Sequence, residues 1–219
     1  MSQRITEAMR KMTEYFLNWN THNNWKAENA TAEDNECLKA LVENGSGWER
    51  TMKIVICCPY RVELAKWLLI NAPDCIDFSE IITKYNRLDL VMLYYEIYPN
   101  VDLNWISLIA IKKGCTDTFK WVVEKLFKKY DLEIFNQKIF HIMQQIMKKG
   151  NTTMFMWLDR SFLLSTVDVT RAIRNSHWDL LELIVKSECQ IVVTIEYLTE
   201  EQIEKSREIL EKSNNVVTT

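Results

Sequence analysis

The stretch KKGCTDTFKWVV at residues 112–123 returns 36 residues later, counting from 112 to 148, as KKGNTTMFMWLD at residues 148–159. In both copies, two lysines and a glycine precede a run whose apolar residues stand at helical spacing. Cations in a last helical turn followed by glycine are typical of the C-terminus of a helix. Each copy therefore predicts a helix that ends at the glycine, a tight turn, and a second helix directly after the turn.

The second helix of this unit follows a pattern that occurs five times in the chain. The five segments are YRVELAKWLL (60–69), NRLDLVMLYY (86–95), GCTDTFKWVV (114–123), GNTTMFMWLD (150–159) and SHWDLLELIV (176–185). An anchor position in the first turn of each segment is usually acidic, as the helix dipole favours there. The anchors are Glu63, Asp89, Asp117, Thr153 and Asp179, at steps of 26, 28, 36 and 26 residues.

Three columns of apolar residues follow the anchors and predict the buried side of these helices. Two positions after the anchor stand Ala65, Val91, Phe119, Phe155 and Leu181. Four positions after it stand Trp67, Leu93, Trp121, Trp157 and Leu183, and the next column holds Leu68, Tyr94, Val122, Leu158 and Ile184. We expect all three columns to lie in the core. The tryptophans share their column with leucine, which cannot stack on bases, so we expect them to be core residues too.

A looser apolar segment precedes each later copy and predicts the first helix of each unit. These segments begin at Asp77-Phe78, Asp102-Leu103, Asp131-Leu132 and Asp168-Val169. The resulting unit resembles the ankyrin repeat, whose period is near 33 residues, over about residues 57–190, although the signature T-P-L-H-x-A is absent from every copy. The unequal repeats are similar to the diverged ankyrin-type proteins of large DNA viruses. This resemblance implies a modulator of host pathways that binds a host protein. HEAT-like and other α-solenoid units also stack helix pairs and remain alternatives.

The composition and the ends of the chain complete the predicted fold. Only four of the 219 residues are glycine and three are proline, which favours long helices joined by short loops. We predict an all-α fold, an α-solenoid of stacked helix-turn-helix repeats with helical caps, with more than about 60% helix against an average near one third.

We predict a single helical-repeat domain over residues 1–219. It comprises an N-terminal helix and irregular connection (1–35), helix-pair repeats (36–190) and a C-terminal capping helix (196–213). The capping helix opens with the capping-box spacing of Thr199 and Gln202. The tail NNVVTT (214–219) is expected to fray.

The sequence favours a cytoplasmic protein, in the host cytoplasm if the chain is viral. No stretch approaches the roughly 20 apolar residues that a membrane span needs. The charged N-terminus lacks the apolar region of a secretory signal. The six cysteines are therefore interpreted as reduced thiols.

We find no catalytic, metal or cofactor motif and predict that the chain is not an enzyme. His22, His141 and His177 have no partners at the spacing of a known metal or nucleophile motif. We expect a structural role for His141. Cys57-Cys58 is a vicinal pair and not C-x-x-C, and NGSG (44–47) lacks the lysine of a phosphate loop.

Lysines at the predicted helix ends are the candidate binding residues. They are Lys112, Lys113, Lys125, Lys128, Lys129, Lys148 and Lys149. A solvated face is the simplest account of them, and a stripe that meets an acidic partner is the functional hypothesis. The net charge of -3 and the pI near 5.7 argue against nucleic acid as the partner. We therefore predict a protein–protein interaction module. A self-assembling structural protein and a nucleic-acid-binding helical array are the alternatives.

Overall fold

The structure is a computed structural model that describes residues 62–71, 83, 85–162, 164–187, 189–213 and 215–219. The chain divides into two compact units, Met1–Asn100 and Val101–Thr219, which are described separately below. The predicted N-terminal helix, the pair Cys57-Cys58, the NGSG segment and His22 lie outside the described residues, as does most of the segment that begins at Asp77.

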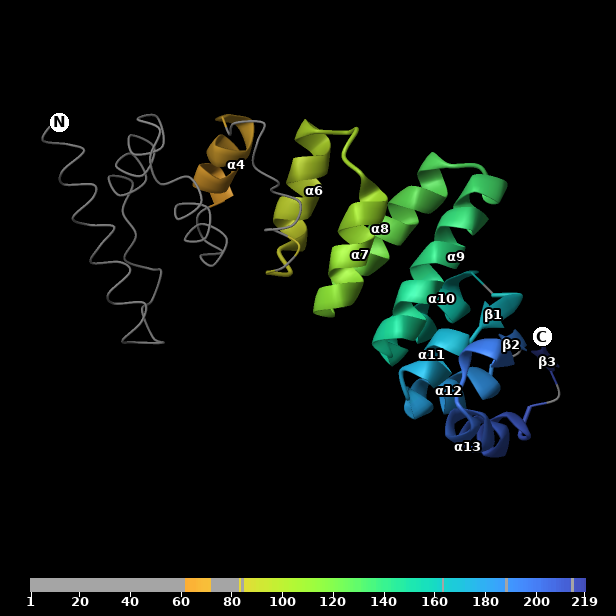
Figure 1. Cartoon of the computed structure of the whole chain (residues 1–219). Coiled ribbons are helices and arrows are strands. Elements are labelled where there is room, and N and C mark those ends of the chain that lie inside the picture. The colour runs from red at the N-terminus through yellow and green to blue at the C-terminus, as the bar shows by residue number, and fades with distance from the viewer. Residues whose placement is uncertain (1–61, 72–82, 84, 163, 188, 214) are drawn as a thin grey trace, which may run out of the picture. The chain divides into compact units, whose positions relative to one another are not determined.

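The described part of the first unit consists mainly of two helices, α4 (Val62–Asn71) and α6 (Leu88–Ile97), which pack against each other (Figure 1). The hydroxyl of Tyr98 donates a hydrogen bond of 2.9 Å to the carbonyl of Leu69 and ties the end of α6 to α4. The packed sides carry apolar residues that are at most 1% exposed, namely Ala65, Leu68, Leu69, Leu90 and Val91.

The second unit is built from helix pairs. Its helices are α7 (Leu103–Lys113), α8 (Thr116–Lys129), α9 (Leu132–Lys149), α10 (Thr152–Phe162), α11 (Thr170–Arg174), α12 (Trp178–Val185), the 3-10 helix η2 (Ile195–Tyr197) and α13 (Glu200–Leu210). The first helices of the pairs pack in the order α7, α9, α11, and the second helices pack in the order α8, α10, α12 (Figure 1). Successive pairs therefore stack in two layers and bury a shared core. The prediction of a mostly helical fold is confirmed.

In the described part of the chain, a residue with left-handed backbone lies in the turn before each of α6, α8, α10 and α12. These residues are Asn86, Gly114, Gly150 and Ser176, and their steps of 28, 36 and 26 residues equal those of the anchors. The following N–H returns to the carbonyl five residues earlier, from Cys115 to Ala110 at 2.9 Å and from His177 to Ala172 at 2.9 Å, the hydrogen bond of a Schellman turn. The two lysine–glycine junctions thus end α7 and α9 as predicted.

The predicted core columns are correct in two cases and wrong in the third. Every residue two positions after an anchor is 0% exposed, from Ala65 to Leu181, and the column five positions after is buried except for half-buried Tyr94. The tryptophan column is half-buried throughout. The position directly after the anchor is buried instead, at Leu90, Thr118, Met154 and Leu180. At roughly 100° per residue, positions one, two and five after the anchor share one face, and position four lies at its border.

Three short parallel strands line one side of the C-terminal part, and the sequence analysis did not predict them. They are β1 (Thr166–Asp168), β2 (Gln190–Val193) and β3 (Val216–Thr218), in the order β1-β2-β3. The prediction that NNVVTT frays is wrong, because β3 pairs with β2 and the N–H of Thr219 donates to the carbonyl of Val193 at 2.9 Å. The β-branched residues in these segments favour strands.

The predicted C-terminal helix is present as α13. The backbone N–H of Gln202 donates to the Thr199 hydroxyl, and the Gln202 side chain accepts from the Thr199 N–H, so both halves of the capping box form. The helix ends at Leu210, a little earlier than predicted. Within the described residues, no helix is long and apolar enough to cross a membrane.

Candidate functional site

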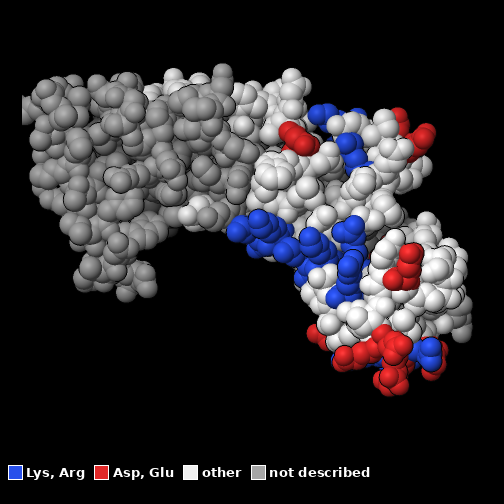
Figure 2. All heavy atoms as spheres, viewed as in Figure 1, with Lys and Arg blue, Asp and Glu red and all other residues white. Residues whose placement is uncertain are grey.

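A row of cations lies where the first helices of three successive pairs end. The members of this row, the basic edge, are Lys112, Lys113, Lys148, Lys149, Arg171 and Arg174, all exposed. Because α7, α9 and α11 lie side by side and point the same way, their C-terminal ends fall on one edge (Figure 1). Figure 2 shows the resulting blue row on the surface. Cations at these ends are also favoured by the helix dipoles.

The other predicted lysines lie elsewhere. Lys125, Lys128 and Lys129 stand in the last turns of α8, which runs opposite to α7 and α9 and therefore ends away from the basic edge. The Nζ of Lys125 lies 5.4 Å from the ring centroid of Trp121, and that of Lys129 lies 5.9 Å from that of Tyr130. The seven predicted residues thus form two separate groups.

Arg171 and Arg174 were missed by the sequence analysis. Lys112, Lys148 and Arg174 each stand two positions before the left-handed residue of their turn. The two lysine–glycine junctions place a cation two positions before the left-handed residue. The same position in the next turn is Arg174, so the repeat pattern could have predicted it.

A hollow of about 620 Å³ opens beside the end of α9 and is called the basic pocket below. Lys148, Arg171 and Arg174 line it, together with Asp168, Gln144, Thr170, Asn175, Thr194 and Tyr197. The Asp168 carboxylate already accepts a hydrogen bond of 3.0 Å from the N–H of Thr170. Three cations therefore outnumber one carboxylate in the lining, and the pocket suits an anionic group.

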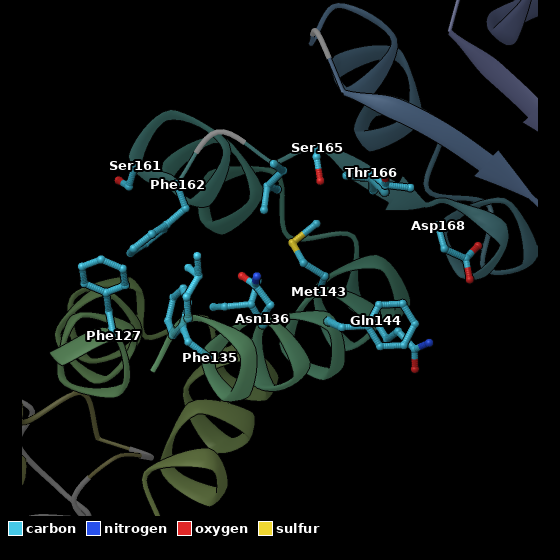
Figure 3. Close-up of a pocket in the computed structure, with 15 residues that line it drawn as sticks. Phe127, Phe135, Asn136, Met143, Gln144, Ser161, Phe162, Ser165, Thr166 and Asp168 are labelled. Atoms are coloured by element: carbon cyan, nitrogen blue, oxygen red, sulfur yellow. The ribbon is translucent and has the colours of Figure 1, made fainter. Parts of the chain in front are cut away.

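A second hollow of about 620 Å³, the aromatic groove, runs along the earlier turns of α9 (Figure 3). Phe127 from α8, Phe135 from α9 and Phe162 from α10 gather at one end of it, with ring centroids 5.1 to 5.4 Å apart. Phe127 is 50% exposed, Phe140 52% and Leu132 68%. Large apolar side chains that line one hollow and stay this exposed are typical of a binding surface.

The helix lengths explain the groove. The 36-residue step gives α9 18 residues, about 27 Å, whereas α11 in the next pair has five, about 8 Å. Such a short helix can cover only part of α9. Residues 161, 162 and 164–168 line the other side of the groove, and Phe127 and Phe140 stay about half exposed along it.

The two hollows adjoin. Gln144 and Asp168 line both of them, and Figure 3 shows these side chains at the end away from the rings of Phe127 and Phe162. One continuous surface along α9 is therefore apolar toward its N-terminus and basic toward its C-terminus.

Cys189 and His141 lie outside this surface. Burial raises the pKa of the Cys189 thiol, which lies 2.8 Å from the Ser187 hydroxyl, so a reactive thiolate is disfavoured there. His141 is exposed with its ring against Phe140. No cluster of three or more His, Cys, Asp or Glu that could hold a metal ion occurs in the described part of the chain.

Comparisons with known proteins found no match for this chain among family models, curated proteins or solved structures.

Proposed function

We propose that this chain is a non-enzymatic module that binds an acidic segment of another protein through the basic edge. The observation that carries the proposal is the alignment of six cations from three successive helices on one edge. Like charges in a row repel one another, and an acidic partner that binds along the row would relieve this repulsion. It would speed association more than it deepens affinity.

The resemblance to diverged viral ankyrin-type proteins supports a host protein as the partner and an α-solenoid of ankyrin-like units as the scaffold. The stacked helix pairs are compatible with that scaffold, because repeat proteins present long surfaces along their edges.

The test compares three variants that change the net charge equally. Lys112/Lys113→Glu and Lys148/Lys149→Glu reverse the basic edge, and Lys128/Lys129→Glu is the matched control. Each pair is exposed and closes a helix, so the dipole penalty is common to all three.

The tagged variants are first used for capture from cell extract, and a captured protein is then purified for rate measurements. We expect both edge variants to slow its association at low salt by about tenfold or more and to flatten the salt dependence. The control should stay within about twofold of the wild type. Equal losses in all three variants, or no loss in any, would overturn the proposal.

A further inference from the structure

We infer that the aromatic groove and the basic pocket together bind one amphipathic segment of the partner protein. Its apolar side chains enter the groove, and its carboxylates enter the pocket. This inference rests on the proposed function and adds the chemistry of the bound segment.

Continuity of the two hollows is the first argument. They share Gln144 and Asp168 as lining residues, so one ligand can occupy both. Phe135 and Lys148 are 13 residues apart on α9, which corresponds to about 20 Å. A segment of about 13 residues as a helix, or about six residues as a strand, spans that length.

The apolar end requires a ligand with large side chains. Phe127 and Phe140 remain about half exposed, and the groove volume is within the usual range for ligand pockets. Burial of one or two aliphatic or aromatic side chains there would remove this apolar surface from water.

The basic end requires carboxylates. Arginine side chains bind carboxylates with paired hydrogen bonds, and Arg171 and Arg174 stand beside Lys148 in the pocket. The Gln202 side chain donates a hydrogen bond of 3.1 Å to the Arg174 carbonyl and holds this turn in place. Beyond it, α13 carries the exposed acids Glu200, Glu201, Glu204 and Glu208, visible as the red end in Figure 2. Their charge would keep the acidic part of a ligand from extending further.

The groove is less suited to single-stranded nucleic acid. Bases bind to open aromatic faces, whereas Phe127, Phe135 and Phe162 meet one another at interplanar angles of 75°, 58° and 49°. The chain as a whole is also acidic, which disfavours nucleic acid.

The test uses random 16-residue peptides displayed on phage and selected on the full chain. Enriched peptides are synthesised with a fluorophore, and their affinities are measured by anisotropy. Phe140→Ala probes the groove and Arg171/Arg174→Glu probes the pocket. Ile134→Ala and Arg160→Glu are the controls, because both residues are exposed and neither lines a hollow. All five probed residues are exposed, and circular dichroism verifies that each variant is folded.

We expect enriched peptides to combine an apolar cluster with an acidic cluster. The same peptide should lose about tenfold or more in affinity with Phe140→Ala and with Arg171/Arg174→Glu, and stay within about twofold with either control.

Several results would overturn the inference. Enrichment could fail, or the peptides could separate into two classes, each sensitive to one hollow. A labelled single-stranded RNA, and not the peptides, could bind in the same assay. Mass measurement could show that a second copy of the chain fills the groove. The proposed function has its own test, and it is wrong if Lys148/Lys149→Glu and Lys128/Lys129→Glu capture the partner at the same rate. Only this inference fails when capture depends on the basic edge while Phe140→Ala behaves as Ile134→Ala.

Discussion

The two lysine–glycine turns are near copies in sequence, yet different side chains pack on them. Gly114 and Gly150 both have left-handed backbone, with φ of 73° and 67°. A Cβ on Gly114 would meet nothing within 4 Å, whereas a Cβ on Gly150 would lie 2.5 Å from the Nδ1 of His177. The Nε2 of His177 also lies 3.0 Å from the Lys148 carbonyl, to which its N–H can donate. The last helix pair therefore covers the turn of the middle pair.

The residue that follows the left-handed position explains why the turns have different surroundings, because its side chain makes different contacts in each pair. His177 reaches back to the previous turn. Asn151 instead caps α10, since its Oδ1 accepts from the N–H of Met154 at 3.0 Å. Cys115 is buried at 4% exposure, and Arg87 pairs with Asp89. Local sequence thus sets the backbone of a turn, whereas one variable side chain sets its surroundings.

The largest expected effects test whether the pairs have equivalent cores beneath these turns. Phe119 in α8 and Phe155 in α10 occupy the same column and are both 0% exposed. Phe119→Ala and Phe155→Ala should each lower the free energy of unfolding by about 3–5 kcal/mol. Urea denaturation followed by circular dichroism measures this change. Trp121→Ala should cost less than either, because Trp121 is half-buried. Unequal losses at the two phenylalanines would mean that the pairs already differ in their cores.

The sequence predicted what depends on neighbours along the chain. The ends of α7 and α9 followed from lysine and glycine, and the register of the core followed from the anchor column. It did not predict the half-exposed tryptophans, because apolar character alone does not tell the centre of a buried face from its border. The aromatic groove was missed for a related reason. Phe127 and Phe140 look like core residues until the mismatch in length between α9 and α11 is known. The strands were missed because three- or four-residue runs carry little periodic signal.

The next effect tests the difference between the turns directly. Gly114→Ala should cost about 1–2 kcal/mol, because a Cβ is strained in left-handed backbone. Gly150→Ala carries the same strain and also overpacks against the His177 ring, which adds about 1–3 kcal/mol. In thermal and urea unfolding, Gly150→Ala should therefore be clearly less stable than Gly114→Ala.

A double variant identifies the cause of that gap. If the His177 ring is responsible, His177→Ala should remove most of the extra cost of Gly150→Ala in a double-mutant cycle. An equal cost for both glycine variants in the wild-type background would show that the ring moves aside and that the two turns are equivalent.

A smaller effect concerns the side-chain cap of α10, which α6, α8 and α12 lack at their own N-termini. Asn151→Ala removes the acceptor for the Met154 N–H and should cost about 1 kcal/mol. Asn151→Asp keeps an acceptor oxygen and serves as the control, so its stability in urea should stay near that of the wild type. If the alanine and aspartate variants unfold at the same urea concentration, the cap contributes nothing measurable.

The smallest effect belongs to the turn at Asn86, where the variable residue is Arg87. Its Nε and Nη2 donate to the Asp89 carboxylate at 2.9 and 2.7 Å, and this hydrogen bonding lowers the pKa of Asp89. The Asp89 side chain is 52% exposed, so the charge pair should contribute only about 0.2–1 kcal/mol at pH 7. The Arg87 side chain is only 13% exposed, so Arg87→Ala also removes packing. A carboxyl whose pKa is lowered by folding stabilises the protein above its unfolded pKa, near 3.9. That contribution disappears as the pH falls through the lower, folded value. The gap between the urea midpoints of the wild type and Arg87→Ala should therefore narrow as the pH falls below about 3.9, whereas Asp89→Asn, which cannot titrate, should lose the charge contribution already at pH 7. If the difference between the two urea midpoints is as large in acid as at pH 7, Arg87 stabilises the protein through packing and not through charge. Its role would then resemble that of His177, which packs on the turn of the middle pair.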